Sequence, residues 1–190
     1  MASTYTDLGI QLMATGEKAG TWGTLTNTNW NIIEQISGGY KIQTLNTAGT
    51  GANTTTLAVS DGSTGATMAS RVIIMGAVSA QAITGNKILT MPVLTENFYL
   101  IKNSTSGAYT VQLKAASGSG ATVTWGTTDK DWKLIYFDGV ATNTGVYDLG
   151  LTTAANTQTL TNKTLTSPKI GTSILDTNGL QLALLTATGS

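Results

Sequence analysis

Residues 87–114 read KILTMPVLTENFYLIKNSTSGAYTVQLK. Within them, three short runs rich in β-branched, aliphatic and aromatic residues (87–91, 98–102 and 109–114) are separated by residues that favour turns. The same pattern of short strand-forming runs between turn-forming residues predicts five more strands, at 40–45, 54–59, 71–78, 121–125 and 132–137. No helical pattern lies between these runs to serve as a crossover, so we expect a mainly β fold: an antiparallel β-sandwich or small barrel rather than a parallel α/β sheet.

The composition excludes several classes of function. The chain of 190 residues has no His and no Cys, so it holds no Ser-His-Asp triad, no cysteine nucleophile, no disulfide and no His/Cys zinc site. Ten basic residues balance ten acidic ones, and only 11% of residues are charged, so nucleic acid is not an expected partner. Met1–Tyr5 carry no basic segment, and no apolar run is long enough for membrane insertion. We expect no cofactor and no metal.

One amphipathic helix is predicted near the N-terminus, over about residues 25–37. Apolar residues recur there at spacings of three and four, Thr24 can cap the start, and Gly38-Gly39 can end the helix. The periodic positions are Leu25, Asn29, Ile32, Ile33 and Ile36, with Trp30 on the flank of the stripe. Upstream, the alternation of Leu8, Ile10 and Leu12 around Gly9 favours extended chain over a second helix.

The acidic residues offer a weak case for catalysis. Asp129, Asp131 and Asp138 form the best local group of carboxylates, and a glycosidase needs two carboxyls about 5–10 Å apart. With Asp61 they are also the candidate ligands for a hard cation such as calcium, but no twelve-residue calcium loop is present. We favour solvated turns at these positions, with neither catalysis nor metal binding.

Two tryptophans on either side of a turn, Trp125 and Trp132, are the candidates for a carbohydrate-binding platform. Along residues 132–137, however, both alternating sets carry apolar groups, as in a strand buried on both sides. We therefore interpret these rings as core residues.

Residues 150–190 change in character. Apolar residues recur there, and charged residues and residues that favour turns are few. A single extended chain has no core in which to bury the apolar side chains. We therefore expect three domains or segments (1–39, 40–149 and 150–190), the last being the start of an extended, intertwined trimeric shaft or a linker. The predicted shaft contacts are Leu160, Leu165, Ile170, Ile174, Leu182 and Leu184.

Several stretches resemble a known family. LGIQLMATGEKAGTWG (8–23), followed by TNTN (26–29) and IIEQ (32–35), resembles the tail-proximal N-terminal part of bacteriophage tail fibre proteins of the marine and cyanobacterial type. Residues 103–111 and 157–170 are also similar to such fibres.

The resemblance implies a virion structural protein, not an enzyme, that is assembled in the host cytoplasm and located on the phage tail. It implies a homotrimer docked to a tail adaptor, nozzle or baseplate protein, with a distal part directed at a host cell-surface glycan. The residues expected to serve attachment and packing are Trp22, Trp30, Ile32, Ile33 and Ile36, with Trp22 acting mainly as an intramolecular anchor of the loop before the helix.

Two alternatives stay open at this point. One is a fragment of a polysaccharide-degrading enzyme of the tailspike type, acting through Asp129, Asp131 or Asp138. The other is a different virion component, such as a collar or head decoration protein.

Overall fold

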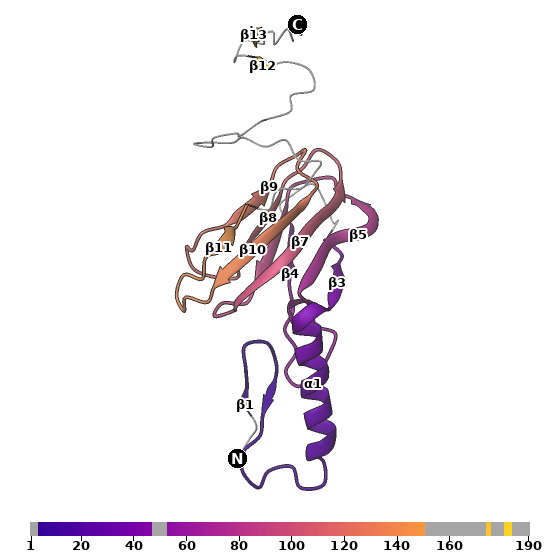
Figure 1. Cartoon of the computed structure of the whole chain (residues 1–190), viewed down its shortest axis with the longest axis vertical. Helices are drawn as coiled ribbons and strands as arrows, with labels where there is room; N and C mark the ends of the chain where they lie inside the picture. The colour runs from indigo at the N-terminus through magenta and orange to yellow at the C-terminus, as the bar shows by residue number, and fades with distance from the viewer. Residues whose placement is uncertain (1–3, 47–52, 151–173, 176–180, 184–190) are drawn as a thin grey trace, which may run out of the picture. The chain divides into compact units, whose positions relative to one another are not determined.

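The structure is a computed structural model that describes residues 4–46, 53–150, 174–175 and 181–183. It is mainly β, with one α-helix among the described residues, as expected (Figure 1). The chain divides into two compact units, residues 1–156 and 157–190. Of the second unit, the structure describes β12 (Ile174–Leu175) and β13 (Gln181–Ala183), which pair antiparallel.

The predicted helix exists as α1 (Trp22–Gly38) and begins three residues before the expected start. The expected cap at Thr24 is wrong, because Thr24 lies inside the helix; the residue before the helix is Thr21, whose side chain makes no capping hydrogen bond. The expected stop is confirmed. The backbone N–H of Gly39 donates to the carbonyl of Gln35, and the chain leaves in an extended conformation directly into β3.

The segment around Leu8 is predicted to be extended, but Leu8 lies in a turn. The turn joins β1 (Thr4–Tyr5) and β2 (Gln11–Leu12), which pair as a short hairpin. Gly9 has φ +81°, and a Cβ there would lie 2.3 Å from the carbonyl oxygen of Ser60. Any residue with a side chain would therefore be strained and would collide with the neighbouring loop.

Besides the hairpin and α1, the first unit contains two larger sheets. The order of the five-stranded sheet is β11-β10-β7-β5-β3, and that of the four-stranded sheet is β4-β6-β8-β9. The strands are β3 (Tyr40–Gln43), β4 (Asn53–Thr56), β5 (Val72–Ala82), β6 (Lys87–Met91), β7 (Glu96–Ser106), β8 (Val111–Ala115), β9 (Val123–Trp125), β10 (Trp132–Asp138) and β11 (Val146–Asp148). The 3₁₀ turn η1 (Thr67–Ala69) and strand β11 had no counterpart among the sequence-based predictions.

The expected antiparallel arrangement is wrong for much of the fold. From β3 to β8 the chain alternates between the two sheets, so that β3, β5 and β7 are parallel neighbours in one sheet and β4, β6 and β8 are parallel neighbours in the other. A strand of the opposite sheet thus serves as the crossover that a helix provides in α/β proteins. Among the described strands of this unit, and apart from the hairpin, only β9, β10 and β11 join antiparallel. Each sheet keeps two edge strands, so the fold is not closed into a barrel.

One hydrophobic core joins the two sheets. Side chains from both sheets meet in it, among them Ile73, Tyr99 and Phe137 of the five-stranded sheet and Leu113 and Trp125 of the four-stranded sheet. The rings of Tyr99 and Phe137 lie 5.2 Å apart, in a tilted arrangement that is favourable for aromatic pairs.

Candidate functional site

Helix α1 exposes an apolar stripe made of Trp22, Trp30 and Ile33. Both tryptophans are 63% exposed and Ile33 is 37% exposed. With 3.6 residues per turn, the three positions fall within an arc of about 80° on the helix surface. The stripe therefore presents two large rings and an isoleucine to solvent in a single chain.

The side of α1 next to the stripe, within about 80° of Trp22, holds the helix against the rest of the first unit. Ile32 is fully buried, and Ile36 is half-buried. Asn29 accepts a hydrogen bond from the backbone N–H of Gln11 (3.0 Å) and donates one to its carbonyl (2.9 Å), which ties β2 to the helix. The five attachment residues predicted from sequence thus lie on two faces: Ile32 and Ile36 face the protein's own chain, and Trp22, Trp30 and Ile33 face outward.

The expectation that Trp22 is mainly an intramolecular anchor is wrong, since most of its ring is exposed. Thr21 and Lys18 define the preceding loop through backbone hydrogen bonds instead. The only charged residue in α1 is Glu34, so the stripe has little charge around it.

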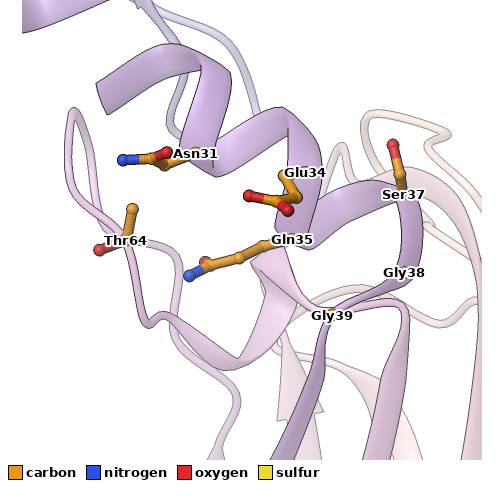
Figure 2. Close-up of a pocket in the computed structure, with 7 residues that line it drawn as sticks. All are labelled: Asn31, Glu34, Gln35, Ser37, Gly38, Gly39 and Thr64. Carbon is orange, nitrogen blue, oxygen red and sulfur yellow. The ribbon is translucent and has the colours of Figure 1, made fainter. Parts of the chain in front are cut away.

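A polar pocket of about 730 Å³ lies at the C-terminal half of α1 (Figure 2). Glu34, Gln35 and Asn31 line it from the helix, and Thr64 lines it from the facing loop. The Gln35 side-chain oxygen accepts a hydrogen bond from the backbone N–H of Gly65 (3.1 Å), which links helix and loop. The lining supplies one carboxylate and no cationic side chain.

The three carboxylates considered for catalysis, Asp129, Asp131 and Asp138, do not lie close enough together to act on one glycosidic bond of a substrate. Asp131 and Asp138 lie at opposite ends of β10, and a strand of this length separates them by roughly 20 Å. Glycoside hydrolysis requires about 5–10 Å. Asp131 accepts a hydrogen bond from the backbone N–H of Trp132 (2.8 Å), and Asp129 pairs with Lys133 (3.0 Å).

Asp138 also lacks the raised pKa of a catalytic acid. Backbone N–H groups of Gly145 and Val140 donate to its carboxylate, and the hydroxyl of Tyr147 adds a third hydrogen bond, so the pKa of Asp138 lies below its ordinary value. These contacts close the loop between β10 and β11. Asp138 thus has the bonding of a turn-forming residue.

Lys133 lies between two carboxylates, Asp129 (3.0 Å) and Asp148 (2.9 Å). Burial lowers its pKa, but the hydrogen bonds and charges of the two partners outweigh burial and raise it. Within residues 4–46 and 53–150, no group of three or more acidic side chains is placed to hold a metal ion, and Asp61 lies instead in the loop beside Gly9.

The two tryptophans of the proposed carbohydrate platform differ in their surroundings. Trp125 is fully buried and donates from its indole N–H to the carbonyl of Asp131 (3.1 Å), so its interpretation as a core residue is confirmed. Trp132 is half-buried and lies on the other face of the five-stranded sheet, with the Lys102 ammonium 5.7 Å from its ring. It is not part of the hydrophobic core.

Two buried donors, Lys87 Nζ and Asn53 Nδ2, have no hydrogen-bond acceptor within the described residues. Their residues are register partners on the parallel strands β6 and β4, and Lys87 is 1% exposed. The alternation of β6 turns Lys87 toward the same side as Leu89 and Met91, which are core residues. An unpaired ammonium in such a place is costly.

Among the predicted shaft residues, Ile174 lies in β12 and Leu182 in β13, and their side-chain contacts stay a prediction. Leu160, Leu165, Ile170 and Leu184 lie outside the described residues.

No helix in the described part of the chain combines the length and apolar character needed to cross a membrane. No protein-family model, no curated protein and no solved structure matches the chain.

Proposed function

We propose that this chain is a virion structural protein: the tail-proximal part of a homotrimeric phage tail fibre that attaches to the tail and supports adhesion to the host. The observation that carries the proposal is the exposed stripe of α1, which lies in the segment whose sequence resembles tail fibres. Trp22 and Trp30 are each 63% exposed on a helix with one charged residue. Large exposed rings in a nearly uncharged surface are typical of protein interfaces.

The remaining geometry is compatible with a structural role. The helix is tied to the N-terminal hairpin through Asn29, and it continues without a linker into β3 (Figure 1). A tail protein that binds the stripe would therefore lie next to the point where the chain enters the sheets. In this role, the β domain spaces the appendage from the tail, and residues 150–190 begin the shaft.

The test is to locate the chain on assembled particles. Cryo-electron microscopy of phage particles carrying a labelled chain is expected to show three copies at each fibre position on the tail. Label on the head or collar would contradict the proposal in favour of another virion component, and absence from particles would contradict a virion role altogether.

A matched pair of variants tests the stripe itself. Trp30→Ser is expected to reduce incorporation of the chain into particles by roughly tenfold or more, the effect typical of losing an aromatic anchor. Val140→Ser, at another strongly exposed apolar residue (52%) in the loop between β10 and β11, is the control and is expected to leave incorporation unchanged. Equal incorporation of Trp30→Ser and the wild-type chain would show that the stripe is not the attachment surface.

A further inference from the structure

The five-stranded sheet is apolar on both faces. Tyr99 and Ile101 of β7 and Ile135 and Phe137 of β10 are buried in the core between the two sheets. Because successive residues of a strand point to opposite faces, the even-numbered residues of β7 and β10 lie on the side away from that core, here termed the outer face.

Strand register gathers apolar side chains into three rows across the outer face. The first row contains Tyr147, Tyr136 and Phe98; the second contains Leu134, Leu100, Val72 and Tyr40; the third contains Trp132, Ile74 and Ile42, with Lys102 between Trp132 and Ile74. A sheet with such residues on both faces is typical of strands that are covered on both sides.

Within the part of the chain that the structure describes, no strand or helix covers the outer face. Tyr40 is 58% exposed, Phe98 is 50% exposed and Tyr147 is 43% exposed, and the other members of the three rows are half-buried. With about 200 Å² for each ring, and smaller contributions from the half-buried neighbours, the exposed apolar area is roughly 500 Å². This is at the upper end for a monomer and is more than half of the roughly 800 Å² that each partner contributes to a stable interface.

Charged side chains on the outer face lie on either side of the second row, and none lies within it. Arg71 lies over the ring of Phe98 (4.1 Å), and Lys102 is 5.7 Å from the ring of Trp132, so both cations are stacked against aromatic rings. Glu96 and Asp138 are register partners at one end of β7 and β10. The central row of Leu134, Leu100 and Val72 has no charged member.

We propose that the outer face is the surface through which copies of this chain assemble, with the outer faces of three protomers turned toward a common axis. The inference rests on the proposed function for the number three. Three identical copies with a net charge of zero can bring Leu134, Leu100 and Val72 of each outer face together, because these three positions carry no charge. A carbohydrate fits this face less well, because sugar sites place hydrogen-bonding groups beside the rings, and the middle of the second row, made of Leu134, Leu100 and Val72, is aliphatic.

The test is the assembly state of the full chain, measured by analytical ultracentrifugation. Phe98→Asp places a carboxylate on the outer face, and we expect it to raise the concentration needed for trimers by roughly tenfold or more. Val78→Asp is the matched control: Val78 is 67% exposed and lies in the irregular part of β5, between the register pairs of Gly76 and Gln81. We expect it to assemble like the wild-type chain.

Circular dichroism checks that each variant is folded. If Phe98→Asp does not fold, Tyr40→Asp on the edge strand β3 takes its place, since Tyr40 is the more exposed of the two. Unchanged trimers in the folded variant, or a monomeric wild-type chain, would overturn the proposal. So would a monomer that binds host polysaccharide through Phe98, which would assign the face to carbohydrate.

The absence of cysteine provides an independent readout. Phe98→Cys is expected to give covalently linked copies with a short bismaleimide, and Val78→Cys is expected to give none; the reverse pattern would overturn the proposal. This result is separable from the particle experiment. A trimer that is absent from phage tails would contradict the proposed function but not this inference. A chain located on the tail whose Phe98→Cys variant is not cross-linked would contradict this inference but not the proposed function.

Discussion

Lys87 gives the sharpest test of the core as described. Its ammonium is fully buried beside Leu89 and Met91 and has no acceptor among the described residues. Lys87→Met keeps an unbranched chain of similar length and removes the ammonium. Burying an uncompensated polar group costs about 1–3 kcal/mol, so we expect the free energy of unfolding to rise by about that amount. For a chain of this size, that corresponds to a rise in Tm of about 2–12 °C.

The assay is urea unfolding followed by tryptophan fluorescence, with the wild-type and variant chains compared at the same concentration. Lys114→Met is the control, because Lys114 is half-buried on the neighbouring strand β8, and we expect its free energy of unfolding to change by no more than about 0.5 kcal/mol. A loss of 1 kcal/mol or more in Lys87→Met would refute the reasoning, because it would show that the ammonium has a stabilising partner in the native protein.

Three further predictions follow from single residues. Gly9→Ala is expected to lower stability by about 1–3 kcal/mol, since the residue has φ +81° and its Cβ would meet the Ser60 carbonyl oxygen; thermal unfolding measures this, and an unchanged Tm would show that the turn is not as described. Trp125→Ala is expected to cost about 3–5 kcal/mol in urea unfolding because it empties a fully buried site, whereas a cost below 1 kcal/mol would place the ring outside the core. Burial raises the pKa of Tyr99 from 10.0 to about 12, so the folded state keeps a proton that the unfolded state loses; stability from this residue is complete below pH 10 and is expected to fall by about 3 kcal/mol as the pH rises to 12. The steeper decline of the wild-type chain relative to Tyr99→Phe over this range checks the last prediction, and parallel pH profiles would contradict it.

Local features of the fold could be predicted from the sequence because they depend on local chemistry. The strand Lys87–Met91 has its predicted bounds, and Gly38-Gly39 ends the helix as expected. The parallel pairing could not be predicted in the same way. Alternation along a strand is the same in parallel and antiparallel sheets, and the crossovers here are strands of the opposite sheet rather than helices.

The outer face shows the same limit at the level of the site. Alternation within residues 132–137 indicated that both sides of this strand are apolar, which favoured burial of Trp132 in a core. Only the register shows that Leu134 continues into Leu100, Val72 and Tyr40, and that no described strand covers this row on the outside. The exposure of Trp22 and Trp30 could not be predicted either. The helical period shows which residues share one side of α1, but it does not show what that side contacts.

An experimental structure of the assembled chain tests the central claim most directly, because it measures the exposure of the outer face in the presence of other copies. We expect Tyr40, Phe98 and Tyr147, which are 58%, 50% and 43% exposed in the single chain, to become largely buried against neighbouring protomers. An assembly in which these three rings keep their exposure, with the outer faces turned to solvent, would contradict it.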